Sequence, residues 1–194
     1  MAIFVRNQNF SRIMDTTVKS TALRFGYIIG GIGVAYTLIA YLIDLTLLTT
    51  WWTGILFLIL LIVLLCVAVG QVKSKMGGYI SFKDAFSTFF VAGLVASLIS
   101  TTVTVLLFNV VDPEAAERLN ELTIESTVRT MEKFGAPEEV IDKQVEELQG
   151  KNQFSLTSQL WTFLGGLLFY AILGAVVAAI MKKNKPAGFP EEVA

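Results

Sequence analysis

The sequence predicts an all-α membrane protein that crosses the bilayer four times. Four long apolar runs are separated by short or charged stretches, 54% of the 194 residues are hydrophobic, and only 16% are charged. A soluble chain of this length could not bury so much apolar surface. The runs are continuous rather than alternating, which favours helices over a membrane barrel because a helix satisfies its backbone polar groups within one segment.

A helix needs about 20 apolar residues to cross the hydrocarbon core. The four runs predict spans at Phe25–Leu48, Gly54–Val72, Ala85–Val111 and Ser158–Met181. The first span follows a basic stretch, as a secretory signal sequence would. Its apolar run is long, however, and no small-x-small cleavage site follows, so we expect a retained anchor.

The distribution of lysine and arginine predicts that both termini are cytoplasmic. Ten of the fifteen basic residues fall in the N-terminal tail 1–24, the loop between spans two and three, and the C-terminal tail 182–194. Four spans place these three segments on one side of the membrane, and the short loop Thr49–Thr53 on the other side has no basic residue. The positive-inside rule assigns the basic side to the cytoplasm. Trp51 and Trp52 fit an aromatic anchor at the outer interface.

Residues 112–157 form the largest polar segment and carry eleven acids against five bases, a net charge of -6. The run Asp112-Pro113-Glu114 is typical of a helix start, with Asp as N-cap and Pro at the first helical position. The run Phe134-Gly135-Ala136-Pro137 indicates a stop, a turn and a second start. We therefore expect helices over 113–134 and 137–149, forming an antiparallel hairpin over the outer membrane surface.

Four acids of this segment share one helix ridge. Glu114, Glu117, Glu121 and Glu125 are spaced at i, i+3, i+7 and i+11. One interpretation is a cation site or a docking face for a basic partner, and the other is a solvated helix face. A calcium loop is not indicated, because the segment lacks spaced Asp or Asn ligands around a central Gly.

The composition argues against several functional classes. The chain has no histidine, which excludes His-dependent triads and His general bases, and its single cysteine, Cys66, allows no internal disulfide. A formal net charge of -1 implies no bulk attraction to nucleic acid. We expect no catalytic residue, no cofactor and no metal ligand.

Small residues recur at helical spacing in three spans. The rows are Gly26-x-x-x-Gly30 in the first span, Ala92, Ala96, Ser100 and Thr104 in the third, and Ala171, Ala175 and Ala179 in the fourth. Such rows let helices approach closely in lipid. They indicate packing within the four-helix bundle or, alternatively, dimerisation.

Asp44 is the one ionisable residue within a predicted span, and it lies near the outer end. An interfacial position explains it without a function, and a role in proton or cation coupling is the alternative. A small transporter or channel would need a polar path, for which Asp44, Ser97, Ser100, Thr101 and Thr104 are the candidates.

The loop before the third span carries a recognisable signature. Gly77 and Gly78 favour a tight turn, and Ser81 with Asp84 fits a capping pair at the start of the next helix. The run Gly77-Gly78-Tyr79-Ile80-Ser81-Phe82-Lys83-Asp84-Ala85-Phe86 resembles the signature of the DUF4199 family, small polytopic membrane proteins of the Bacteroidota with no assigned activity. The resemblance covers about Leu23 to Lys185. It implies a multi-pass protein of the bacterial inner membrane whose acidic hairpin lies in the periplasm.

The leading functional hypothesis is a non-enzymatic subunit, scaffold or modulator of an envelope complex. Membrane or periplasmic proteins would be its partners, and a homo-oligomer is a further possibility. The transporter or channel is the alternative. An enzyme acting on lipids would need converging carboxylates or a Ser/Lys cluster, and the sequence offers none.

Overall fold

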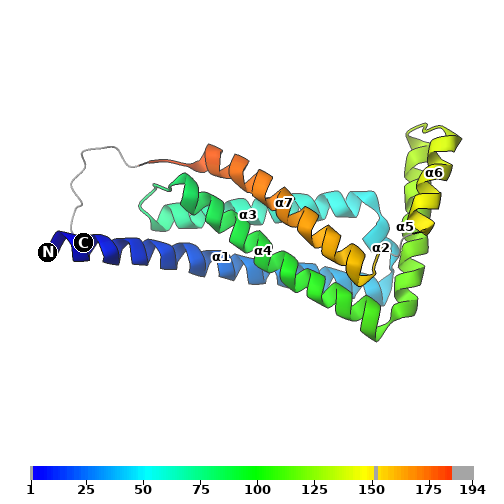
Figure 1. Cartoon of the computed structure of the whole chain (residues 1–194), viewed down its shortest axis with the longest axis horizontal. Helices are drawn as coiled ribbons and strands as arrows, with labels where there is room; N and C mark the ends of the chain where they lie inside the picture. Colours follow the sequence, from blue (N-terminus) through cyan, green and yellow to red (C-terminus); the bar gives the residue numbers. More distant parts are fainter. Residues whose placement is uncertain (1, 151–152, 185–194) are drawn as a thin grey trace. The chain divides into compact units, whose positions relative to one another are not determined.

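The computed structural model describes residues 2–150 and 153–184, with side chains from residue 16 onward. Its elements are helices, drawn in chain order in Figure 1: α1 (Ala2–Ile43), α2 (Thr46–Thr49), α3 (Trp51–Lys75), α4 (Phe82–Leu106), the π-helical segment η1 (Leu107–Val111), α5 (Pro113–Lys133), α6 (Glu138–Gln149) and α7 (Leu156–Met181). The described residues form no strand, only an isolated antiparallel bridge between Ile80 and Lys183. Lys151 and Lys185, counted above among the bases, lie outside the described residues.

The prediction of four helices that are long and apolar enough to cross a membrane is confirmed. The segments long and apolar enough to span a bilayer are Thr16–Ile43, Trp51–Lys75, Phe82–Val111 and Leu156–Met181. The first ends before the predicted Leu48, and α1 extends back to Ala2 through the residues that we assigned to a tail. The other three helices begin a few residues earlier than predicted. Helix α3 begins at Trp51, α4 begins at Phe82 directly after its cap Ser81, and α7 begins at Leu156.

The chain divides into two compact units, and each of the four apolar helices contributes a segment to both. Unit 1 comprises Met1–Ile29, Ile62–Ala96 and Leu167–Ala194, and unit 2 comprises Gly30–Leu61 and Ser97–Gly166. Within each unit several small residues lie at helix contacts, as expected for packing inside the bundle, whereas Ala179 of the predicted row in the fourth span is exposed.

Close contacts in unit 1 join α1 to α4 and α4 to α7. A Cβ added at Gly26 would lie 2.7 Å from the Cβ of Val95, and one added at Gly93 would lie 2.9 Å from the Tyr170 ring. Ala92 and Ala178 are fully buried. These positions therefore need a small residue for the helices to approach.

Unit 2 contains the polar segment and the parts of the four apolar helices that adjoin it in sequence or lie in the same unit. A Cβ at Gly33 would lie 2.7 Å from the Ser100 hydroxyl, which places α1 against α4 here too. Helices α5 and α6 lie side by side in both figures and are joined by a turn in which Gly135 has a φ of 73°. The two helices begin and end close to the predicted positions.

We expect Gly26→Ala to destabilise the protein by about 1–3 kcal/mol. The new methyl group would clash with the Val95 side chain and the Ala92 carbonyl oxygen on α4. Thermal unfolding of the detergent-solubilised protein measures this change. Gly31→Ala is the matched control on the same helix, since a Cβ there meets nothing within 4 Å. Equal stability of the two variants would contradict the close contact between α1 and α4.

Candidate functional site

A cleft of about 660 Å³ in unit 2 lies between the end of α1 and the first turns of α5. Its polar lining residues are Tyr41, Asp44, Asp112, Arg118, Glu121 and Glu125, and its apolar lining residues are Leu42, Ile43, Leu45, Ala115 and Leu122. Four carboxylates and one guanidinium therefore share a space with the exposed apolar end of a membrane-crossing helix.

One side of the cleft is built by the turn that ends α1. The Asp44 Oδ1 accepts a hydrogen bond from the Thr46 N–H at 2.9 Å, which gives the backbone an alternative to continuing the helix. The same N–H, followed by the Thr46 side chain, lowers the pKa of Asp44. Asp44 is exposed and follows the last residue of the first span, so its carboxylate is held ionised outside the apolar segment.

The other side of the cleft is built by the start of α5. The Asp112 Oδ1 accepts from the Ala115 N–H at 2.9 Å, which confirms the predicted N-cap, and Pro113 follows it. The second oxygen, Oδ2, accepts from the Tyr41 hydroxyl at 2.8 Å. The pKa of Asp112 is lowered by the Ala115 N–H, then by the Tyr41 hydroxyl, with a further contribution from the Arg118 charge.

An apolar cluster joins these two sides and shares Tyr41, Leu45 and Ala115 with the lining of the cleft. Its buried members are Leu107, Phe108, Ala115, Ala116 and Leu119, and Tyr41, Leu45, Leu48 and Phe154 pack against it. The π-helical turn of η1 brings Leu107 and Phe108 into the cluster just before Asp112 ends the segment. Asn109 Nδ2 also donates to the Phe154 carbonyl at 2.8 Å. The side of α5 next to the cleft is therefore packed against the end of α1 and the η1 segment.

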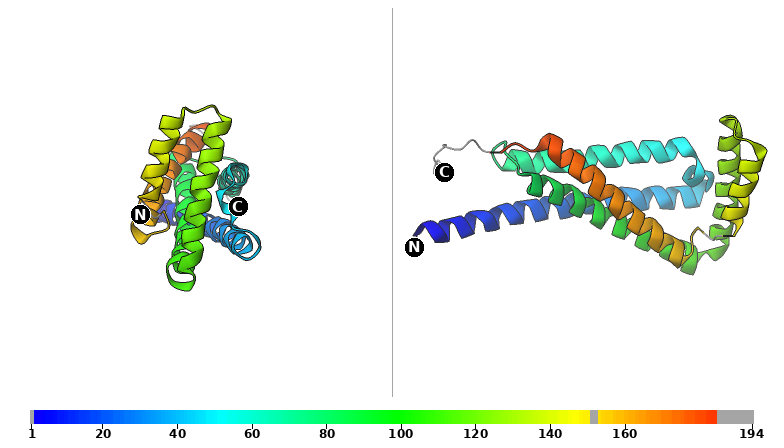
Figure 2. Two further views of the ribbon diagram at one scale, coloured as in Figure 1. Left: turned by 90° about the vertical axis from the view of Figure 1, so that its right-hand side faces the viewer. Right: turned by 45° about the horizontal axis from the view of Figure 1, so that its top comes forward.

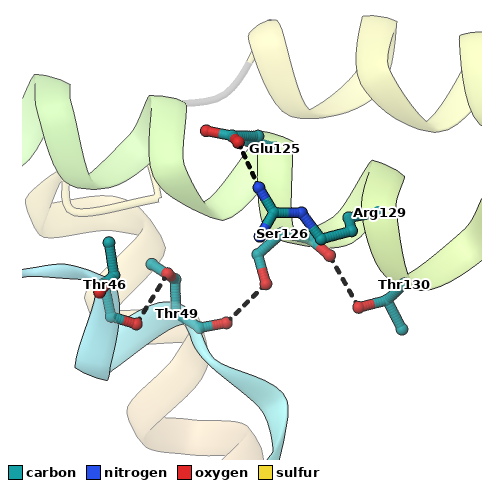
Figure 3. Close-up of polar contacts among 6 residues, drawn as sticks. All are labelled: Thr46, Thr49, Glu125, Ser126, Arg129 and Thr130. Carbon is teal, nitrogen blue, oxygen red and sulfur yellow. Dashed lines mark hydrogen bonds and ion pairs between the residues drawn. The ribbon is translucent and has the colours of Figure 1, made fainter.

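Further along α5, a hydrogen bond joins this helix to α2. The Ser126 hydroxyl donates to the Thr49 carbonyl at 2.8 Å, beside the ion pair of Arg129 with Glu125 at 2.6 Å (Figure 3). The ion pair is solvent-exposed and contributes little to stability. Glu125 also lines the cleft.

The cleft brings together several residues that the sequence singled out separately. Asp44 and two members of the acidic ridge, Glu121 and Glu125, line it, whereas Glu114 and Glu117 do not. None of the candidate Ser and Thr residues of α4 lines it either. The Ser100 hydroxyl instead lies beside Gly33.

Sequence reasoning missed Tyr41 and Arg118. Arg118 carried a usable signal, because it lies four residues after Glu114 and three before Glu121, on the same ridge. Tyr41 had no such signal, since its partner Asp112 is 71 residues away along the chain. Among the described residues, no group of three or more Asp, Glu or Cys side chains is arranged to hold a metal ion.

The signature loop has a structural role in unit 1. Gly77 and Gly78 have positive φ angles of 71° and 84°, as a tight turn requires. The Ser81 hydroxyl accepts from the Asp84 N–H at 3.1 Å and donates to the Asp84 carboxylate at 2.6 Å, which confirms the capping pair. The loop is thus shaped to start α4.

The same loop fastens the end of α7. Buried Ile80 exchanges backbone hydrogen bonds with Lys183, at 3.0 and 2.9 Å, and the Lys183 ammonium lies over the Tyr79 ring. Lys73 Nζ donates to the Met181 carbonyl at 2.9 Å, the last residue of α7, where a cation is favoured by the helix dipole.

Comparison with protein families supports the resemblance carried by this loop. Residues 24–183 match the model of the family described as "Protein of unknown function (DUF4199)". The chain belongs to the DUF4199 family. In searches of curated proteins and of solved structures, nothing matches this chain. The signature that carries the resemblance is therefore, in this DUF4199 protein, the loop that starts α4 and fastens α7.

We expect Tyr41→Phe to lower stability at neutral pH, because the Asp112 carboxylate loses a donor. A folded-state pKa below the ordinary 3.8 means that this contribution is present above pH 3.8 and is lost as pH falls through the folded pKa. The difference in unfolding temperature between the variant and the wild type should therefore shrink on acidification. Tyr27→Phe, at an exposed tyrosine, is the control. A difference that stays constant from pH 7 down to pH 2 would contradict the assigned bond.

Proposed function

We propose that this DUF4199 protein is a non-catalytic subunit, scaffold or modulator of an envelope complex in the bacterial inner membrane. Both termini would be cytoplasmic, and α5 with α6 would form the periplasmic hairpin. Four bilayer-crossing helices support a role inside the membrane. The observation that carries the proposal is a groove in the polar segment whose chemistry suits a protein partner.

This groove has a volume of about 490 Å³ and lies between α5 and α6. Apolar side chains line it together with three acids, and the lining residues are Val128, Glu132, Ala136, Glu138, Ile141, Asp142 and Val145. Glu138 and Asp142 are exposed one helical turn apart. The arrangement fits a partner that inserts an apolar side chain and places Lys or Arg beside it.

Co-purification from native membranes in a mild detergent tests the proposal. We expect a membrane or periplasmic protein to be recovered in a fixed ratio to the tagged chain. A chain recovered alone after mild cross-linking of intact cells would contradict a role as a subunit.

We expect the double variant Glu138→Gln/Asp142→Asn to recover about fivefold less of that partner at low ionic strength, because charges at the edge of an interface mainly speed association and hold the partner in register. The difference should narrow as salt is added. Quantitative proteomics of the purified complex measures the ratio. Glu146→Gln changes an exposed acid of α6 that does not line the groove and should leave the ratio unchanged. An equal decrease in recovered partner for the double variant and for Glu146→Gln would contradict docking at the groove.

A further inference from the structure

We infer that the cleft between the end of α1 and the start of α5 binds the headgroup of an amino-phospholipid, a group that joins a primary ammonium to a phosphate. This inference concerns a different surface from the groove of α5 and α6, and it stands whether or not the protein has a protein partner. Three features of the cleft support it: its depth in the membrane, its charges and its apolar border.

The cleft lies where two membrane-crossing helices leave the bilayer. Asp44 directly follows Ile43, the end of the first span, and Asp112 directly follows Val111, the end of the third. The Tyr41–Asp112 hydrogen bond joins these two ends inside one compact unit. Polar groups that begin at the last apolar residue of a span lie at the level of the lipid headgroups.

The apolar surface beside the cleft fits lipid tails. Leu42, Ile43, Val110 and Val111 are each more than two thirds exposed, and the first two also line the cleft. A soluble polar ligand would gain nothing from this border. An amphiphile would place its headgroup among the charges and continue its acyl chains along the exposed helix ends.

The charges of the cleft are arranged for a dipolar headgroup. Arg118 forms no hydrogen bond or ion pair with another side chain in the described part of the chain, although its charge acts on Asp112, whose two oxygens already accept hydrogen bonds. Its guanidinium is thus available to a phosphate, for which planar donors are well suited.

The ammonium of the headgroup would face the carboxylates. Glu121 lies one helical turn from Arg118 on α5, and both residues line the cleft. Asp44 is exposed and lines the same cleft, so its carboxylate can face the ammonium too. A primary ammonium offers three N–H donors to these oxygens, whereas a choline headgroup offers none. With four carboxylates against one guanidinium, the cleft disfavours a purely anionic headgroup.

Binding of short-chain lipids to the purified, delipidated protein in detergent tests the inference. The probes are dioctanoyl phosphatidylethanolamine, phosphatidylcholine and phosphatidylglycerol, with phosphoethanolamine as the free headgroup, and native mass spectrometry gives the affinities. We expect phosphatidylethanolamine to bind tightest. Arg118→Gln and Glu121→Gln should each weaken it about tenfold, as for loss of one charge-assisted hydrogen bond.

Glu117→Gln is the matched control, because Glu117 is an exposed acid of the same helix that does not line the cleft. Its affinity for phosphatidylethanolamine should equal that of the wild type, and thermal unfolding without lipid checks that all three variants are folded. The inference would be overturned if the three lipids bound with equal affinity. It would also be overturned if Glu117→Gln weakened phosphatidylethanolamine binding as much as Arg118→Gln and Glu121→Gln. Phosphoethanolamine binding as tightly as the lipid would overturn the assignment to a lipid and indicate a soluble ligand.

Discussion

The hydrocarbon interior of a bilayer offers no hydrogen-bond partner to a backbone group, and this constraint determines where the polar chemistry of the chain lies. Inside the four spans, the backbone is satisfied by helices, and the contacts are made by small residues such as Gly26 and Gly93. The demanding positions are the helix ends, where N–H and carbonyl groups lose their intrahelical partners. The polar side chains with the best-defined hydrogen bonds serve these ends.

The signature loop and the cleft are two results of this one constraint. In unit 1, Ser81 and Asp84 start α4, and Lys73 satisfies the last carbonyl of α7. In unit 2, Asp44 closes the end of α1 and Asp112 opens α5. In this DUF4199 protein the signature residues therefore have structural partners, whereas the cleft also contains charged groups, Arg118 and Glu121, that no helix end uses.

Local patterns in the sequence predicted the parts of the structure that depend on local physics. The length of the apolar runs gave the four spans, and the spacing of Asp112, Pro113, Ser81 and Asp84 gave the caps. The end of α1 was not predictable from hydropathy, because Leu45, Leu47 and Leu48 continue the apolar run beyond the turn that Asp44 makes. Several residues of the cleft were singled out one by one from the sequence, but their meeting in one place was not predicted. The central hydrogen bond of the cleft and the bridge between Ile80 and Lys183 join residues far apart in the chain, and periodicity contains no information about such pairs.

The placement of α5 and α6 outside the cell interior is the claim on which the proposed envelope partners depend. Labelling of Glu132→Cys with a membrane-impermeant maleimide, in a Cys66→Ala background and in intact bacterial spheroplasts, tests it most directly. Lys83→Cys, at an exposed position in the first turn of α4, is the internal comparison. The account predicts that position 132 is labelled in intact spheroplasts and that position 83 is labelled only after lysis. The reverse pattern would contradict it.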